Sequence, residues 1–272
     1  MSALGASLAR AARAYPTLLR VGLAEAVAYR AEMVVWMLTT TMPLVSLALW
    51  SAVASKGPVG RFGQQQFGAY FLCTLVVRQL TGSWLVWALN MEIRSGTLSQ
   101  RLLRPIHPLV SYSAENLSAV PMRALISAPM AVIAMFVIEP GSLPHTPGRI
   151  ALILASLVGA WTITFFTMAL VGALAFFIES STSIFEIWLV VFGLLSGYLV
   201  PLELLPGWLQ TISDALPFRY TVAFPVEATL GLLPPGAALR NLAVQWAYVA
   251  GCAGAALWVW RAGIRRFSAF GG

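Results

Sequence analysis

The chain has 272 residues, of which 59% are hydrophobic and only 10% are charged. A water-soluble domain of ordinary composition carries about 25% charged residues, because its surface must be solvated. The deficit of charge extends along the whole sequence. The composition therefore excludes an ordinary soluble protein and predicts an integral membrane protein whose main solvent is the lipid bilayer.

The formal net charge is +7. Basic proteins attract the phosphates of nucleic acids. Here, however, the arginines punctuate apolar runs and do not form a polar basic domain. Nucleic acid is therefore not expected as a partner.

The first 30 residues predict an amphipathic helix that lies in the membrane interface on the cytoplasmic side. On a helical wheel Arg10, Arg13 and Arg20 share one face, where they can approach anionic headgroups. Pro16 is expected to kink this helix or divide it. The first long apolar run starts only near Met33, so the N-terminus is expected to be retained. The opposite face is apolar and consists of Leu4, Leu8, Ala11, Tyr15, Leu18 and Leu19.

Several apolar runs approach or exceed the length of about 20 residues that a helix needs to cross a bilayer. They predict an all-α, polytopic membrane protein with a single transmembrane domain over residues 1–272. The predicted fold has six transmembrane helices. They are expected at about residues 33–54, 67–90, 117–138, 150–178, 185–204 and 241–260.

The distribution of basic residues predicts the orientation, because lysine and arginine accumulate on the cytoplasmic side. With six spans, both termini and the loop 91–116 lie on one side of the membrane. An odd number of spans would place the terminal arginine cluster outside. The side of the termini holds ten basic residues, namely Arg10, Arg13, Arg20, Arg30, Arg94, Arg101, Arg104, Arg261, Arg265 and Arg266. The other side holds five, namely Lys56, Arg61, Arg149, Arg219 and Arg240. Both termini are therefore expected in the cytoplasm.

The loop 91–116 contains the stretch EIRSGTLSQRLLRPIHP, which predicts a short helix. Gly96 can end the incoming helix, and Thr97 followed by Gln100 has the form of a capping box. The new helix is expected to end by Arg104, because Pro105 disfavours helical geometry in the residue before it.

This short helix has the shape of a docking element. Leu98 and Leu102 are expected on one face, with Arg101 and Arg104 turned away. Such a helix can insert into a cleft of another protein. The alternative is an ordinary turn that carries positive charges on the cytoplasmic side.

Residues 205–239 are apolar but contain five prolines, so no uninterrupted helix there is long enough to cross the bilayer. We expect short re-entrant helices before the last span, on the outer side. One of them should present Trp208, Leu209 and Ile212 on a common face.

Two arginines, Arg78 and Arg123, fall within predicted spans, where charge is costly and therefore a functional candidate. Arg78 lies near the middle of its span, so it should pair with a carboxylate or face a polar cavity or a subunit seam. Glu203 and Glu139 are the candidate partners. Arg123 lies closer to the cytoplasmic boundary and is expected to extend its side chain towards it.

The sequence contains no pattern that indicates an enzyme. His107 and His145 are expected on opposite sides of the membrane, so they cannot share a metal. No G-x-x-x-x-G-K-[ST] loop is present, and the single lysine, Lys56, stands in a short outer loop. No cofactor is expected to bind this chain, and an ATPase would have to be a separate subunit.

With these motifs in view, the chain resembles permeases of the ABC-2-type exporter family, in particular a bacterial branch of similar length. Four stretches carry the resemblance: AYRAEMVVWML, EIRSGTLSQRLLRP, VPLELLPGWLQTISDALPFRY and GIRRFSAFGG. They extend from residue 28 to the end of the chain, so the resemblance covers nearly all of it.

The resemblance implies that the first cytoplasmic loop contains a coupling helix, here Thr97–Arg104, which contacts an ATP-binding-cassette ATPase that binds ATP and Mg. It also implies that the N-terminal helix lies beside the ATPase. The residues assigned to ATPase coupling are Glu92, Arg94, Gly96, Thr97, Leu98, Gln100, Arg101, Leu102 and Arg104. The re-entrant segment that would cap the outer end of the pathway contributes Glu203, Pro206, Trp208 and Pro217.

The sequence therefore predicts the membrane-spanning permease subunit of an ATP-driven exporter in the bacterial cytoplasmic (inner) membrane. Its expected partners are ATPase subunits, a second identical or homologous permease, and the lipid bilayer. A hydrophobic or amphipathic substrate is favoured. A secondary transporter or channel, a membrane enzyme such as a lipid transferase, and a scaffold without transport are the alternatives.

Overall fold

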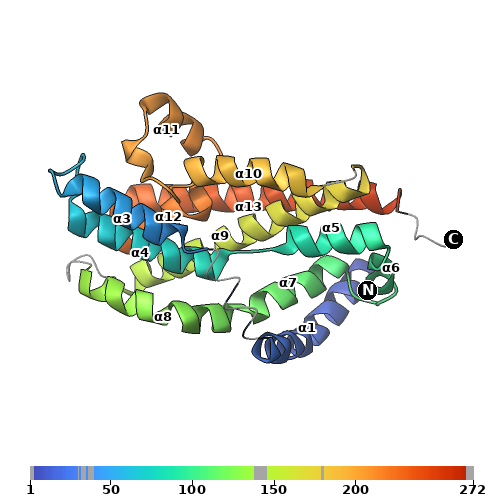
Figure 1. The fold of residues 1–272 in the computed structure, drawn as a ribbon. Coiled ribbons are helices and arrows are strands. Elements are labelled where there is room, and N and C mark those ends of the chain that lie inside the picture. The colour runs from blue at the N-terminus through green and yellow to red at the C-terminus, as the bar shows by residue number, and fades with distance from the viewer. Residues whose placement is uncertain are drawn as a thin grey trace.

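The computed structural model describes residues 3–29, 31, 35, 40–137, 146–178 and 181–267. They form an elongated bundle of helices (Figure 1). The α-helices are α1 (Ala3–Ala28), α3 (Met42–Ala54), α4 (Gln64–Thr81), α5 (Leu85–Ser95), α6 (Leu98–Leu102), α7 (Pro108–Ser118), α8 (Val120–Val137), α9 (Pro147–Ala173), α10 (Ser181–Leu195), α11 (Gly207–Asp214), α12 (Ala223–Leu230) and α13 (Pro235–Ile264). Short 3-10 turns are η2 (Leu174–Phe176), η3 (Leu202–Leu204) and η4 (Arg219–Thr221).

Four stretches of the described residues are long and apolar enough to cross a membrane, which confirms a multi-pass, all-helical protein. Two further apolar helices, α3 and α10, are shorter than the 18 residues that a candidate span needs. Residues 33–34 and 36–39 of the first predicted span lie outside the described residues. The four candidate spans are Gln64–Ser95, Pro108–Ala134, Pro147–Phe176 and Pro235–Ile264.

The second predicted span, 67–90, is not one continuous helix. α4 ends at Thr81, Gly82 adopts an extended conformation with φ −65° and ψ 145°, and α5 begins at Leu85. Gly82 and Ser83 are buried. Irregular backbone at membrane depth persists only where protein or a cavity covers it, and this interruption is covered in that way.

The third predicted span, 117–138, starts earlier than expected. Its helical stretch begins at Pro108, whose fixed φ suits the first position of a helix. The helix is interrupted at Ala119, between α7 and α8. Pro121 has no N–H to donate to a carbonyl of the preceding turn, which a continuous helix would require. The predicted loop 91–116 therefore reduces to residues 96–107, and its second half belongs to α7. Residues 138–145, with Glu139 and His145, lie outside the described residues.

The fifth predicted span, 185–204, also ends early, because α10 stops at Leu195. Gly197 has φ +82°, a left-handed conformation that favours glycine. Its carbonyl accepts a hydrogen bond from the Tyr70 hydroxyl at 2.8 Å, and the neighbouring Ser196 carbonyl accepts one from the Ala223 N–H at 2.9 Å. The chain therefore turns here to meet the start of α12.

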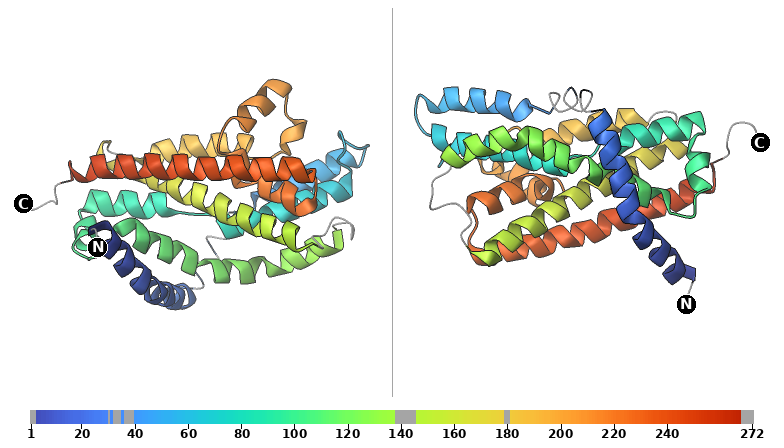
Figure 2. Two further views of the ribbon diagram at one scale, coloured as in Figure 1. Left: turned by 180° about the vertical axis from the view of Figure 1, so that it is seen from behind. Right: turned by 90° about the horizontal axis from the view of Figure 1, so that it is seen from below.

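The amphipathic N-terminal helix is confirmed, although Pro16 does not divide it. α1 is a single helix of 26 residues with Pro16 inside it. Arg10, Arg13 and Arg20 are exposed, whereas Tyr15 and Leu18 are partly buried. Figure 2 shows that α1 crosses the bundle obliquely over α7. The two helices can approach closely at this crossing because residue 22 is a glycine. A side chain at this position would collide with the Ser118 hydroxyl.

The long helices pack side by side along the bundle, with α13 against α9, α4 against both α3 and α8, and α5 against α9. α12 is packed inside, against α4 and α9, with Phe224 and Val226 fully buried. α6, the start of α1 and the end of α13 lie at one end of the molecule, and α11 lies towards the other (Figure 1). The loop with α6 and the end of α13 therefore lie at one end of the bundle, and α11 lies away from them.

Gly197→Ala should destabilise the fold, because a side chain at positive φ costs about 1–2 kcal/mol and its Cβ would lie 2.9 Å from the Ala223 Cβ. We expect a lower midpoint of thermal unfolding for the protein purified in detergent. Gly207→Ala is the matched control, since its Cβ would enter open space. Equal midpoints for the two variants would contradict the assigned turn.

Candidate functional site

The loop between α5 and α7 projects from one end of the bundle and has a defined structure. Gly96 ends α5 with φ +75°, as the sequence predicts. α6 follows over Leu98–Leu102, and its end before Arg104 confirms the predicted short helix. The predicted capping box is wrong, because Thr97 is helical at φ −68° and its hydroxyl contacts Ser95 at 2.8 Å and caps no backbone N–H.

Arg101 fixes α6 against the helices on both sides of it. Its Nε lies 2.8 Å from Glu92 Oε2 on α5, and its Nη2 lies 3.2 Å from Glu115 Oε2 on α7. The Tyr112 hydroxyl donates to Glu92 at 2.7 Å, and the Arg101 guanidinium stacks 4.3 Å from the Tyr112 ring centroid. The sequence did not predict that Arg101 is bound within its own chain, by two carboxylates on the flanking helices.

The ion pairs also favour the charged form of Arg101. Partial burial lowers the pKa of Arg101, but the hydrogen bonds to Glu115 and Glu92 outweigh burial and raise it. The guanidinium therefore remains charged at every physiological pH. A charged, two-sided link of this kind holds the loop in one arrangement relative to α5 and α7.

The exposed side of α6 differs from the expected one. Leu98 is fully buried among side chains of α5, α7 and α9, so it cannot dock into another protein. Leu102 is 37% exposed and Leu103 is 87% exposed, and Arg104 and Gln100 are also exposed. We call Gln100, Leu102, Leu103 and Arg104 the loop tip. The helical wheel misplaced Leu98 because it cannot show that this loop folds back onto its own bundle.

α1 lies beside this loop. A cavity of about 390 Å³ between them is lined by Leu18, Gly22 and Glu25 of α1 and by Gln100 and Arg104 of the loop, among others. The Tyr15 hydroxyl is 3.2 Å from the Ser113 hydroxyl of α7. The N-terminal helix and the loop therefore form one continuous surface at this end of the molecule.

His107 closes the loop by capping α7. Its Nδ1 accepts a hydrogen bond from the Leu109 N–H at 3.2 Å, which requires a ring with an unprotonated Nδ1. Partial burial, and then the nearby Arg261, lower the pKa of His107 and so favour this form. His107 is therefore an exposed histidine that also caps α7.

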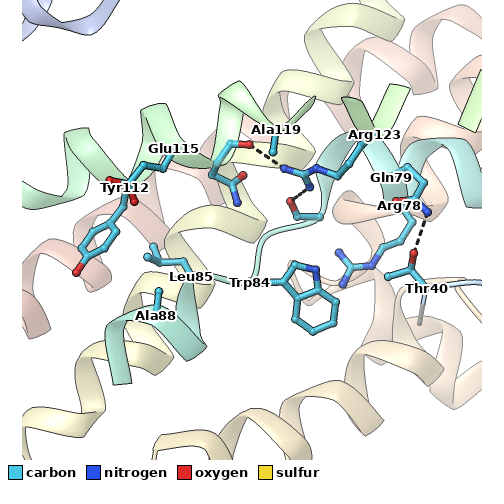
Figure 3. A pocket seen from close by; sticks show the side chains of 12 residues that line it. Thr40, Arg78, Gln79, Trp84, Leu85, Ala88, Tyr112, Glu115, Ala119 and Arg123 are labelled. Carbon is cyan, nitrogen blue, oxygen red and sulfur yellow. Dashed lines mark hydrogen bonds between the residues drawn. The ribbon is translucent and has the colours of Figure 1, made fainter. Parts of the chain in front are cut away.

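The second notable region is a cavity of about 290 Å³ beside the interruption between α4 and α5 (Figure 3). Both intramembrane arginines line it, together with the Trp84 indole. Arg123 is 8% exposed and donates to the Gly82 carbonyl at 2.6 Å and to the Asn116 carbonyl at 2.8 Å. The donors of Arg123 therefore satisfy backbone carbonyls inside the protein, one of them on α7.

Arg78 faces the same cavity, one of the outcomes that the sequence left open. It is 6% exposed, and its guanidinium carbon lies 5.0 Å from the ring centroid of Phe192. Glu203, one expected partner, binds Arg61 instead, with nitrogen–oxygen distances of 2.6 and 2.8 Å. Glu139, the other, lies outside the described residues.

The predicted outer residues gather at the opposite end of the molecule, in η3, α11 and the turn that follows. Pro206 precedes α11, Trp208 is 66% exposed on it, and Pro217 comes before η4. Arg219 lies 2.7 Å from both Asp214 and Glu227, so it ties this segment to the buried α12. The predicted site residues therefore form three separate places and not one site.

Residues 40–271 match the family described as ABC-2 family transporter protein. The chain belongs to the ABC-2 transporter family. No curated protein and no solved structure matches it. ABC-2 proteins are membrane subunits of ABC transporters and associate with ABC ATPases.

Sequence reasoning missed several residues that shape both regions of this ABC-2 protein. Glu115 and Tyr112 complete the Arg101 cluster but lie more than ten positions away in the chain. Gly82 and Ser83 form the interruption, and the only available signal was a Gly-Ser pair inside an apolar run. Within the described ranges, no group of three or more His, Cys, Asp or Glu side chains is placed to hold a metal ion.

Arg101→Gln should loosen the loop of this ABC-2 protein by about 1–2 kcal/mol, because it leaves Glu92 and Glu115 without their cation. We expect faster hydrogen–deuterium exchange of the backbone amides of residues 96–107. Arg94→Gln is the matched control, since Arg94 is exposed on the same end of α5 and makes no ion pair with another described residue. Unchanged exchange in Arg101→Gln would show that the cluster does not order the loop.

Proposed function

We propose that this chain is the permease subunit of an ATP-driven exporter and that the loop tip is the coupling element that contacts the ATPase. Membership of the ABC-2 family supports the first part. The observation that carries the second part is the exposure of Leu102, Leu103 and Arg104 on a loop that Arg101 fixes to α5 and α7. An apolar and basic tip on a rigid support can transmit force from a partner.

The proposed orientation puts this end of the bundle in the cytoplasm. Arg94, Arg101 and Arg104 lie on α5 and in the loop, and Arg261 lies near the end of α13 at the same end of the bundle (Figure 1). Such a concentration of arginine favours the cytoplasmic side. Both termini are then cytoplasmic, and α1 lies in the inner interface with its exposed arginines near anionic headgroups. The membrane is the bacterial inner membrane.

We propose that the chain crosses the membrane six times. α3 and α10 form the two shorter crossings. α10 spans about 22 Å at 1.5 Å per residue, less than the roughly 30 Å of a bilayer core. The turn at residues 196–204, which includes η3, would supply the remaining depth. α11 and α12 would then be re-entrant elements that enter from the outer face and cap the pathway, with Trp208 at the interface.

The working unit would contain two permeases, identical or homologous, above two ATPase subunits that bind ATP and Mg. Closure of the ATPases would push the loop tips and open the seam between the permeases to the outside. The described spans carry few charges, so a hydrophobic or amphipathic substrate is favoured over a hydrophilic ion.

Leu103→Asp and Arg104→Glu should lower the amount of ABC ATPase that copurifies with the chain by about tenfold or more, equal to roughly 1.4 kcal/mol of binding free energy. The measurement is purification of the tagged full chain from its native membrane in mild detergent, with quantitative mass spectrometry of retained proteins. Insertion and yield should remain normal, because both side chains are exposed.

Two controls separate docking from folding. Lys56→Glu reverses a charge in the loop at the other end and should retain the ATPase. Leu98→Ala, which removes a buried side chain, should lower stability by about 2–5 kcal/mol. Repeated purification of the wild-type chain without an ATPase, even after crosslinking at residues 102–104, would contradict the proposal and favour a secondary transporter.

A further inference from the structure

The cavity at the α4–α5 interruption contains two positive charges and no matching negative charge among the described residues. Arg78 makes neither a hydrogen bond nor an ion pair with another described residue, and Arg123 bonds only to two neutral carbonyls. A Cβ built on Gly82 would lie 3.3 Å from Arg78 Nη1 and 3.6 Å from Arg123 Nη1. The two guanidinium groups therefore flank the same short piece of backbone and repel each other.

The one carboxylate that lines this cavity is already engaged. Glu115 contributes to the wall, but its oxygens accept hydrogen bonds from Arg101. Among the other described acidic residues, Glu203 binds Arg61, Asp214 and Glu227 bind Arg219, and Glu25 and Glu186 do not line the cavity. A buried cation without an anion is expensive, so an external anion would stabilise this arrangement.

The cavity has the size and wall of a headgroup site. Its volume of about 290 Å³ is at the lower limit of the roughly 300–1,000 Å³ of ligand pockets, so it can hold a headgroup but not a whole amphiphile. Away from the arginines, the wall includes Trp84, Leu85 and Ala88. These apolar side chains would accept the first carbons of a tail. The cavity is partly open to the surface, so a tail can extend outwards.

The depth of the cavity also suits a headgroup from the inner leaflet. α1 crosses α7 where Gly22 meets Ser118. Arg123 follows Ser118 by five residues, or about 7.5 Å at 1.5 Å per residue of helix. With α1 in the interface, Arg123 lies just below the headgroup region.

We propose that the cavity between Arg78 and Arg123 binds the anionic headgroup, a phosphate or a carboxylate, of a membrane amphiphile. The guanidinium groups would clamp the anion through charge-assisted, forked hydrogen bonds, a geometry that lysine cannot reproduce. The Arg123–Gly82 bond would hold one guanidinium in place before binding. The assignment to the inner leaflet rests on the proposed orientation, whereas binding of the anion depends neither on the loop tip nor on whether the amphiphile is transported.

The test is native mass spectrometry of the delipidated full chain titrated with dioleoylphosphatidylglycerol or with zwitterionic dioleoylphosphatidylcholine. We expect the wild-type chain to bind phosphatidylglycerol about tenfold more tightly than phosphatidylcholine. Arg78→Gln should abolish this preference, whereas Arg78→Lys should keep part of it. Arg240→Gln, which removes an exposed charge near the start of α13, should behave as the wild type does.

A second variant covers the case in which Arg78→Gln fails to fold. Ala88 is exposed on α5 and lines the cavity, so Ala88→Trp should fill the site and lower phosphatidylglycerol binding without removing a charge. Competition with inorganic phosphate tests whether the anion that binds this cavity is free phosphate or the headgroup of a lipid. Displacement of the lipid would support a site for the anion alone, and retention would support a site that also holds the tail.

Equal binding of the two lipids by the wild-type chain would overturn the proposal. Unchanged phosphatidylglycerol binding in a folded Arg78→Gln or Ala88→Trp variant would overturn it as well. Because the ATPase takes no part in the measurement, either result leaves the proposed coupling function to be judged separately.

Discussion

The structure depends on one constraint, the need to pair every backbone polar group that lies away from water. The second span is interrupted at residues 82–84, where a helix would have satisfied its own carbonyls. Arg123 donates to the Gly82 carbonyl at this interruption and to the Asn116 carbonyl near the end of α7. α5 begins directly after this interruption, and Gly82, Arg78 and Arg123 all line the cavity beside it.

The charged side chains are arranged differently at the two ends of the bundle and in the region between them. At the loop end, Arg101 is shared by two carboxylates. At the other end, Arg61 and Arg219 bind Glu203, Asp214 and Glu227. Between them, Arg78 and Arg123 face a cavity without a carboxylate of their own among the described residues. The ends are thus held by internal ion pairs, whereas the middle keeps its positive charge available.

Much of the architecture could be predicted from the sequence, because lipid exposure leaves long apolar runs and the arginine distribution gives them an order. The helix end at Gly96 and the interrupted segment after Pro206 could also be predicted, because glycine and proline act on the backbone at their own positions. The orientation of Leu98 and Arg101 was not readable. A helical wheel shows which residues share a face but not which face the rest of the protein covers, and Glu115 is too far along the chain to signal its role.

The interruption between α4 and α5 has a mechanical consequence. The helices on either side of the loop both lose continuity near the same place, since α7 gives way to α8 around Ala119 and Asn116 donates to Ser83 at 3.2 Å. Arg101 links Glu92, near the loop end of α5, to Glu115, near the end of α7 that meets α8, and so joins the two helices into one arm. An arm that is joined along its length and interrupted at its base would act as a lever, so that a displacement of the tip would bend the joint. The wall of the two-arginine cavity is built on that joint, and its shape would change with the angle of the arm.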